Sequence, residues 1–321
     1  MEGRDKRKVP RETRIDEDMT KRKVMVVGAE GLLGQQLIQT IRDETNWKII
    51  AVGRKFVVDE EGYRRWEGKG AKEWKELMVQ ERWRPHTIIN AAAMTNVDAC
   101  EINKEEAWNA NVVLVENLIG VCRRIEATMV QISTDHVFDG EAGPYSEEDR
   151  PNPINYYGRT KLAAENICIR SGVESVVIRT MWLYGARNGK RQSFLDWVLE
   201  RITRDEEIPI TDDELGNPTH YEDLAYGIIR CVEQKGHGTI HMAGPERVTR
   251  KEWVDIICQQ LRKEKECRLN TIKSSDLARA AKRPLSSGLV SMRARYELGI
   301  SMADVREGVE MTIVRDERNE G

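Results

Sequence analysis

A glycine-rich turn near the start of the chain restricts the fold more than any other sequence feature. Residues 28–34 read GAEGLLG; they follow an apolar run, and the amphipathic stretch after them predicts a helix over residues 32–42. A dinucleotide pyrophosphate needs bare backbone and the free N–H groups of a helix N-terminus. We expect Gly28 to form the turn, Gly31 to admit the phosphates, and Gly34 to let helix and strand pack closely. An ordinary glycine-rich turn without a ligand is the alternative.

Segments with strand and helix patterns alternate after this turn. The strand patterns cover residues 23–27, 47–52, 87–92, 128–133 and 175–179, and the helix patterns cover 104–124 and 157–170. Such alternation predicts an α/β fold with a Rossmann-like, doubly wound parallel sheet. Beyond residue 185 the rhythm loosens, with helices expected near 193–203, 249–262 and 276–281. This half is predicted to form a smaller C-terminal substrate-binding domain.

The predicted domain boundaries follow from these patterns and from the charged ends of the chain. A disordered charged tail, 1–22, is expected to precede a dinucleotide-binding Rossmann domain, 23–185. Residues 186–312 form mainly the substrate-binding region, with some elements expected to return to the Rossmann sheet. Residues 313–321 are expected to form a frayed tail.

Composition excludes several classes of partner. Charged residues make up 33% of the chain, but the net charge is only −3, so we expect neither nucleic acid nor a membrane surface as partner. No apolar run approaches the ~18 residues that span a bilayer, and no signal-peptide pattern is present. We therefore expect a cytoplasmic protein. A homo-oligomer is compatible with the sequence.

The cysteines and histidines show no pattern of a metal site. The six cysteines, at 100, 122, 168, 231, 258 and 267, include no CxxC pair, so we expect reduced thiols, mostly in the core. His237 and His241 are four residues apart but have no evident third ligand. No metal is predicted.

The end of the second predicted strand indicates which dinucleotide binds. An NAD enzyme usually has an acid there for the ribose 2′-hydroxyl, whereas this strand ends Gly53-Arg54-Lys55, with no acid before Asp59. A planar guanidinium suits a 2′-phosphate. NADPH is therefore the expected cofactor, with Arg54 as its contact and NADH as the alternative. Two surface cations without a ligand would give the same sequence.

A tyrosine and a lysine share one face of a predicted helix. Tyr157 and Lys161 lie four residues apart, and Thr134 ends a strand upstream. A neighbouring ammonium lowers the pKa of a tyrosine from about 10, which makes the phenol a usable proton donor. The hydroxyl of Thr134 could bind the carbonyl oxygen being reduced.

Five motifs occur in the order typical of one family. They closely resemble those of the dTDP-4-dehydrorhamnose reductase family, and the resemblance covers about residues 22–305, including 216–219 (GNPT) and 283–289 (RPLSSGL). The five motifs are 28–34 (GAEGLLG), 90–98 (NAAAMTNVD), 133–140 (STDHVFDG), 157–162 (YGRTKL) and 179–185 (RTMWLYG).

The resemblance implies roles for individual residues. Thr134, Tyr157 and Lys161 would be catalytic, and Thr134, Asp135 and Trp182 would contact the sugar. The implied reaction is NADPH-dependent reduction of the C4 ketone of a nucleotide-linked 4-keto-6-deoxy sugar, giving dTDP-L-rhamnose in the type member. From the residues alone, Asp135 could instead cap a turn and Trp182 could be a core aromatic. The resemblance implies cofactor contacts for Gly31, Leu32, Leu33, Ala92, Ala93 and Met94, and the residue patterns add Gly28, Gly34, Arg54, Tyr157 and Lys161.

Two departures and two alternatives accompany this interpretation. His136 stands where the family often has tyrosine, and Gln35-Gln36 stand where magnesium-bridged dimers carry glutamate, so we predict neither that metal nor that dimer. The regulatory β subunit of methionine adenosyltransferase resembles the same family and binds NADP without being the catalyst. A non-catalytic regulatory subunit of that kind, or a 4-ketoreductase for another nucleotide sugar, is therefore the alternative function.

Overall fold

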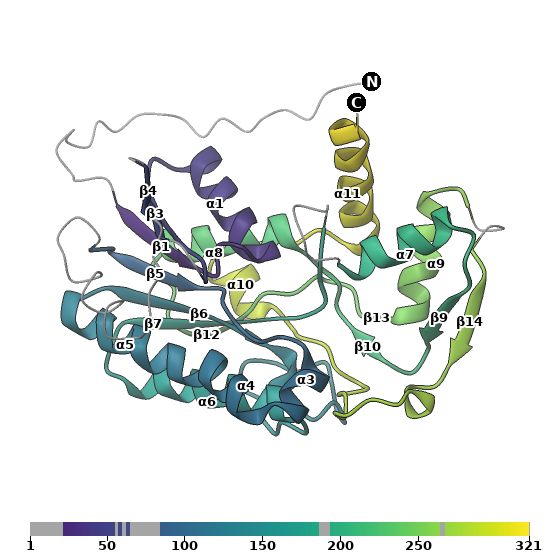
Figure 1. Ribbon diagram of the computed structural model, residues 1–321, viewed down its shortest axis with the longest axis horizontal. Coiled ribbons are helices and arrows are strands. Elements are labelled where there is room, and N and C mark those ends of the chain that lie inside the picture. Colours follow the sequence, from purple (N-terminus) through teal and green to yellow (C-terminus); the bar gives the residue numbers. More distant parts are fainter. Residues whose placement is uncertain are drawn as a thin grey trace.

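An eight-stranded sheet forms the larger half of the computed structural model (Figure 1), which describes residues 22–54, 57–59, 62–64, 84–185, 193–263 and 267–320. The strand order is β12-β7-β6-β5-β1-β2-β3-β4. Neighbours from β12 to β2 are parallel, as predicted, whereas β3 and β4 add an antiparallel hairpin at the edge. The strands are β1 (Lys23–Val27), β2 (Lys48–Val52), β3 (Val57–Asp59), β4 (Gly62–Arg64), β5 (Thr87–Asn90), β6 (Thr128–Thr134), β7 (Ser175–Thr180) and β12 (Gly238–His241).

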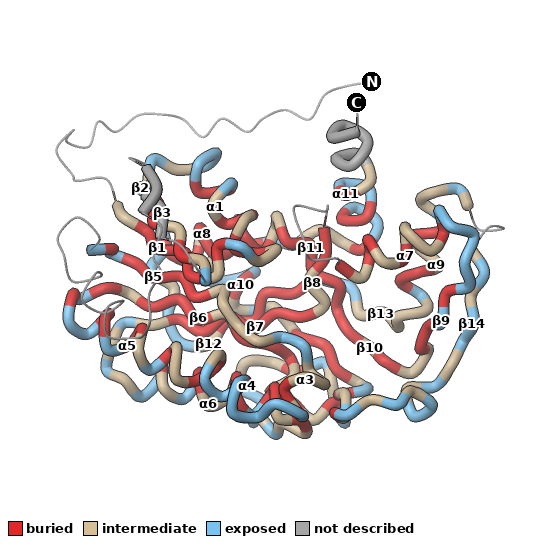
Figure 2. Tube along the Cα trace, viewed as in Figure 1, coloured by how far each residue is buried: buried red, intermediate tan, exposed pale blue. Residues whose placement is uncertain are grey.

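Helices cover both faces of this sheet (Figure 1). Successive side chains of a strand point to opposite faces, so the apolar β1 strand contributes to two cores. Val24 and Val26 pack in the first core, and Met25 and Val27 pack in the second. Figure 2 shows the resulting buried centre of the sheet. The first core is covered by α1 (Leu32–Glu44) and α8 (Tyr221–Glu233), and the second by α5 (Leu114–Ile125) and α6 (Tyr156–Arg170).

A smaller lobe lies beyond the carboxyl ends of these strands and has its own core around Trp253, which is fully buried. The chain does not stay in this lobe after residue 185. Strand β12 returns to pair with β7, α8 packs on α1, and α10 (Met292–Tyr296) lies beside β12. The lobe contains α7 (Phe194–Thr203), β9 (Ile208–Thr211), β10 (Leu215–Gly216), β13 (Val248–Thr249), α9 (Arg250–Gln260), β14 (Leu269–Ile272) and α11 (Val305–Glu320).

Three predicted segments differ from the structure. The helix expected over 276–281 is wrong: only a 3₁₀ turn, Ser274–Asp276, forms, and the N–H of Ala281 donates to the Asp98 carboxylate instead of to a helical carbonyl. The helix expected over 104–124 contains a π-helical turn, Asn109–Val113. The end expected to fray from residue 313 is helical as far as Glu320. The tail predicted over 1–22 lies outside the described residues except for Arg22.

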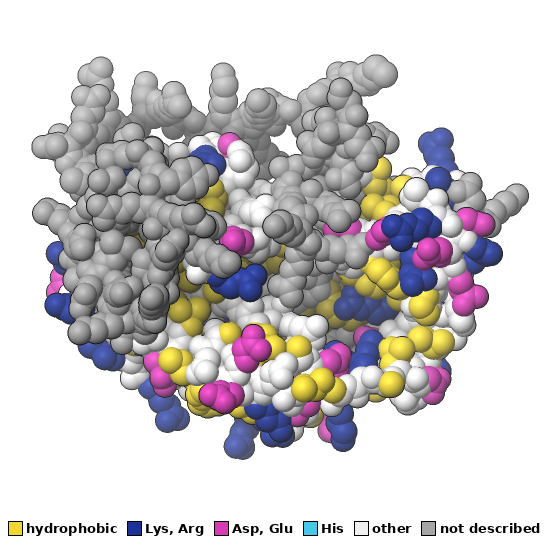
Figure 3. Space-filling view, in the orientation of Figure 1, with side chains coloured by type: hydrophobic (Ala, Val, Ile, Leu, Met, Phe, Trp, Pro, Cys, Tyr) yellow, Lys and Arg dark blue, Asp and Glu magenta, His cyan; other side chains and the backbone are white. Residues whose placement is uncertain are grey.

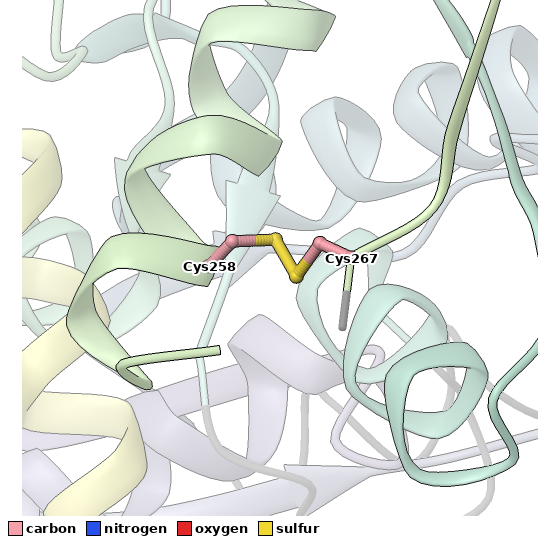
Figure 4. The surroundings of a disulfide bond; sticks show 2 residues. All are labelled: Cys258 and Cys267. Carbon is pink, nitrogen blue, oxygen red and sulfur yellow. A yellow bond between two sulfur atoms is a disulfide. The ribbon is translucent and has the colours of Figure 1, made fainter. Parts of the chain in front are cut away.

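The prediction that all six cysteines are reduced is also wrong. Cys258 and Cys267 form a disulfide with a Cα–Cα distance of 6.3 Å (Figure 4). It joins α9 to the segment that leads into β14, so the pairing depends on how the smaller lobe folds. The other four cysteines are free and buried, as expected: Cys100, Cys122, Cys168 and Cys231.

Candidate active site

The glycine turn joins β1 to α1 and has the backbone geometry that the sequence predicts. Gly28 has φ +87°, and a Cβ atom on it would lie 2.6 Å from the backbone nitrogen of Ala92. A Cβ atom on Gly34 would overlap the carbonyl oxygen of Gly28. Gly31 is the N-cap of α1 and has no side-chain cap, and no acid lies in the first turn of that helix. Leu32 and Leu33 begin the helix. Because the N–H groups at this helix start have no side-chain cap and no acid beside them, the turn fits a dinucleotide pyrophosphate.

The loop after β5 forms the facing side of the turn and carries Ala92, Ala93 and Met94. The buried Asn111 fixes this loop: its Oδ1 accepts the Met94 N–H at 2.7 Å, and its Nδ2 donates to the Met94 carbonyl at 3.1 Å. The same amide donates to Thr160 on α6 at 2.9 Å. Asn111 therefore connects the expected cofactor loop to the helix that carries Tyr157 and Lys161.

Charges of opposite sign lie close together where β2 ends beside the glycine turn. Arg54 is exposed, and its backbone N–H donates to Oε2 of Glu30 in the glycine turn at 3.1 Å. A carboxylate therefore lies beside the residue expected to contact a 2′-phosphate. The neighbouring Lys55 lies outside the described residues.

Thr134, Tyr157 and Lys161 lie on β6 and α6, which pack against each other. The Lys161 ammonium donates to the carbonyl of Ile132 on β6 at 2.6 Å. Burial lowers the pKa of Lys161 to about 8, although the Glu165 carboxylate opposes this shift. The hydroxyl of Thr134 donates to Asp135 at 3.1 Å and accepts the His136 N–H at 3.2 Å.

The His136 ring packs against the Tyr157 ring. The two rings meet edge to face with centroids 5.4 Å apart. Asn155, the N-cap of α6, contacts Nδ1 of His136 at 3.0 Å and accepts the Gly158 N–H at 2.8 Å. Burial lowers the pKa of His136, so its imidazole is neutral at neutral pH.

A cavity of about 500 Å³ opens between the sheet and the smaller lobe. Asp135, His136 and Trp182 line it, whereas Thr134, Tyr157 and Lys161 do not; Tyr157 contacts its wall through His136. Asp135 also accepts a hydrogen bond from Ser287 at 2.8 Å, which ties it to the segment 283–289. Further lining residues are Phe194, Trp197, Arg250, Arg279 and Arg283.

The three arginines of the cavity differ in their partners. Arg279 pairs with Glu214, and Arg283 pairs with Asp98 at 2.6 Å. Arg250 has no carboxylate within ion-pair distance among the described residues. Its guanidinium carbon lies 3.7 Å from the Trp182 ring centre, 4.7 Å from that of Phe194 and 5.5 Å from that of Trp253. Burial lowers its pKa to about 10, so it remains charged at neutral pH.

Trp182, which packs against the Arg250 guanidinium, has an uncommon backbone conformation. Its φ is +45°, a left-handed conformation that is costly for a bulky residue, and its ring stacks on Trp253 with centroids 6.0 Å apart. Strain of this kind persists only where surrounding structure imposes it. Trp182 is therefore both packed against the core of the lobe and exposed to the cavity. Figure 3 shows basic and hydrophobic side chains side by side on this lobe.

The parallel sheet, the close-packed glycine turn between β1 and α1, and the helix that carries Tyr157 and Lys161 define a Rossmann-like α/β protein with a turn of the dinucleotide-binding type. Within that class the chain belongs to the RmlD substrate binding domain family, whose sequence pattern matches residues 22–317. The expected family resemblance and fold are thereby confirmed.

Similar proteins include reductases and a subunit of a transferase. A probable low-salt glycan biosynthesis reductase of Haloferax volcanii is 28% identical over 88% of this chain and 94% of its own length. The dTDP-4-dehydrorhamnose reductase of Bacillus anthracis, solved in complex with NADP, has a TM-score of 0.81 and 26% identity, covering 92% of this chain and 100% of its own. Methionine adenosyltransferase 2 subunit beta of Bos taurus is 29% identical over 76% of this chain and 74% of its own length.

Several residues of this site were not predicted from the sequence. Asn111 gives one usable signal, because it is an amide within a mostly apolar helical stretch. Glu30 lies inside the quoted glycine motif, but only the structure places its carboxylate at Arg54. Arg250 follows the N-cap Thr249, and nothing in the sequence indicates that three aromatic rings surround it. The described residues contain no cluster of three metal-ligating side chains, and no helix among them could cross a membrane.

Proposed function

We propose that this protein reduces the C4 ketone of a nucleotide-linked 4-keto-6-deoxy sugar with NADPH. The type reaction, dTDP-4-dehydro-L-rhamnose to dTDP-L-rhamnose, is the first substrate to test. The observation that carries the proposal is the cavity whose wall, at His136, touches the Tyr157 ring while Lys161 lies one helical turn further along α6.

In the proposed mechanism the residues of β6 and α6 handle the proton. When bound, NADPH supplies the hydride. Tyr157 donates its phenolic proton to the C4 oxygen, and the Thr134 hydroxyl hydrogen-bonds that oxygen. The Lys161 ammonium stabilises the phenolate that remains. Reorientation of His136 or entry of the sugar must bring Tyr157 into contact with the cavity, since Tyr157 is only 8% exposed.

The rest of the cavity suits the other parts of such a substrate. Among the described residues Arg250 has no carboxylate at ion-pair distance, although Glu214 and Asp135 act on it from further away, and its positive charge matches that of a diphosphate. Phe194 and Trp197 offer apolar ring faces beside it for a nucleobase. We further propose that residues 23–185 bind mainly NADPH, through Arg54 on the 2′-phosphate, and that residues 186–312 bind mainly the nucleotide sugar.

NADPH oxidation assayed against dTDP-, UDP- and GDP-linked 4-keto-6-deoxy sugars tests the proposal. Turnover of one of them that disappears in Tyr157→Phe supports it. The alternative, a regulatory subunit, predicts no turnover of any ketosugar together with capture of methionine adenosyltransferase in a pull-down. That pair of results would overturn the ketoreductase proposal.

A further inference from the structure

A buried acid lies one helical turn beyond the expected catalytic lysine on α6. Glu165 is 1% exposed and follows Lys161 by four residues on α6, so Tyr157, Lys161 and Glu165 share one face of the helix. The Glu165 carboxylate accepts a hydrogen bond from the Ser133 hydroxyl on β6 at 2.5 Å. It therefore links the helix to the strand that ends in Thr134.

Arg179 on β7 completes this connection. Its Nε and Nη2 donate to the two oxygens of Glu165 at 2.9 and 2.7 Å, and the arginine is 4% exposed. On its other sides it lies over the Phe138 ring, 5.0 Å from the ring centre, and 3.3 Å from Nε2 of His241. Burial lowers the pKa of His241 to about 3, so this histidine adds no charge at neutral pH.

The groups that act on Lys161 come from helices α3 (Val97–Ile102) and α6 and from β6. Besides Glu165 they are the thiols of Cys100 and Cys168 and the carbonyl of Ile132. Burial raises the pKa of Cys100 to about 11 and that of Cys168 to about 12, so both thiols are neutral at working pH. Glu165 is thus the carboxylate that acts on Lys161, and it opposes the effect of burial on this lysine.

We propose that Glu165 is a positioning residue for the reaction: it keeps Lys161 protonated and holds α6 in place through Ser133 and Arg179. The role of Lys161 rests on the proposed ketoreductase function. A buried ion pair is weak evidence for stability, because the cost of removing both charges from water offsets their attraction. Stability alone therefore does not explain the bidentate pair, whereas a role in holding the charge of Lys161, one helical turn away on α6, does.

Glu165→Gln tests the proposal, because it removes the charge and keeps the shape. Lys161 should then lose its proton at lower pH, so the alkaline limb of the kcat profile should move down by about one pH unit, which is about tenfold in rate along the falling limb. The ¹³Cε signal of Lys161, assigned with Lys161→Met, should titrate lower by the same amount. Glu174→Gln is the matched control, because Glu174 is exposed and lies just after α6. This substitution should change neither the pH profile of kcat nor the titration of Lys161.

A second variant separates charge from folding. Glu165→Gln leaves the Arg179 guanidinium buried without its carboxylate and can lower stability, whereas Glu165→Gln with Arg179→Met removes both charges. The proposal predicts that this double variant also titrates Lys161 lower than wild type. Wild-type titration of Lys161 in both variants would overturn it and leave Glu165 a purely structural residue. If no ketosugar is reduced by the wild type, the proposed function fails, yet the NMR titration still decides the role of Glu165.

Discussion

The half of the molecule that we propose to bind NADPH (the nucleotide-binding half) builds its expected site from main chain, whereas the half that we propose to bind the sugar (the substrate half) builds its expected site from side chains. In the first half, Gly28 and Gly34 allow strand, turn and helix to approach closely, and backbone N–H groups face the expected pyrophosphate. At the cavity, Arg250 and Trp182 come from segments far apart in the chain and meet over Trp253. A main-chain site requires glycine at fixed spacing, so a short motif reveals it. A side-chain cavity requires only that distant residues converge.

The two halves also differ in the partners of a buried charged side chain. The Glu165–Arg179 pair in the nucleotide-binding half satisfies both of its members. Arg250 in the substrate half has aromatic neighbours and no ion-pair partner among the described residues. A satisfied pair maintains geometry, whereas an unpaired cation is available to a ligand. Substitutions in the first half should therefore change kcat or cofactor use, and those at Arg250 should change substrate binding.

The largest expected effect is at Tyr157. Tyr157→Phe removes a proton transfer that occurs only in the transition state, so kcat should fall by roughly 10²–10⁴-fold. NADPH binding, followed by fluorescence titration, should change little because the ring and Lys161 remain. Tyr156→Phe is the matched control and should keep its activity, since Tyr156 contacts Lys104 near the surface. Near-full activity of Tyr157→Phe on every accepted ketosugar would contradict the assignment.

The next largest effect is expected on stability, when the disulfide of the substrate half is removed. Replacing Cys258 by Ser opens a loop of nine-residue separation, which should lower the free energy of unfolding by about 2–3 kcal/mol. Urea denaturation of wild type with and without dithiothreitol provides the control, because the variant should not respond to the reductant. Alkylation of all six thiols in the native, unreduced protein would show that the bond is absent.

Arg250→Met tests the difference between the halves directly. A hydrogen bond to a charged group contributes about 1.5–3 kcal/mol, so the KM for the nucleotide sugar should rise roughly 10- to 100-fold while kcat stays within a few-fold. Lys251→Met is the control, because Lys251 pairs with Asp255 at 2.7 Å on the surface. A fall in kcat with unchanged KM would break the comparison and assign Arg250 to the chemistry.

The smallest expected effect is at the exposed end of β2. Arg54→Ala should raise the NADPH Kd about fivefold and leave NADH nearly unchanged, because an exposed charge pair contributes up to ~1 kcal/mol. Glu30→Gln should shift the preference the other way, toward NADPH, since a carboxylate beside Arg54 disfavours a 2′-phosphate. Calorimetric titration with both cofactors measures both changes. Equal effects of Arg54→Ala on the two cofactors would exclude a role in selection.

The errors of the sequence interpretation lie mainly in the substrate half. The helix expected over 276–281 does not form, because Leu277 and Arg279 face the cavity and Ala281 bonds to Asp98. Local propensity could not foresee these partners. The cysteine pair was missed for the same reason: its two members meet only after α9 and β14 have packed together. Helix α6, by contrast, begins within one residue of its predicted start because Asn155 caps it locally.

The sequence alone determined the α/β alternation, the glycine turn and the spacing of Tyr157 and Lys161, since each depends on residues close together in the chain. Tertiary structure decided which charges act on one another. Glu165 reaches Arg179 from α6 to β7, and Arg250 enters an aromatic cage from three segments. The physical reason is range: backbone geometry and side-chain periodicity are local, whereas burial and Coulomb interactions depend on neighbours that only folding brings together.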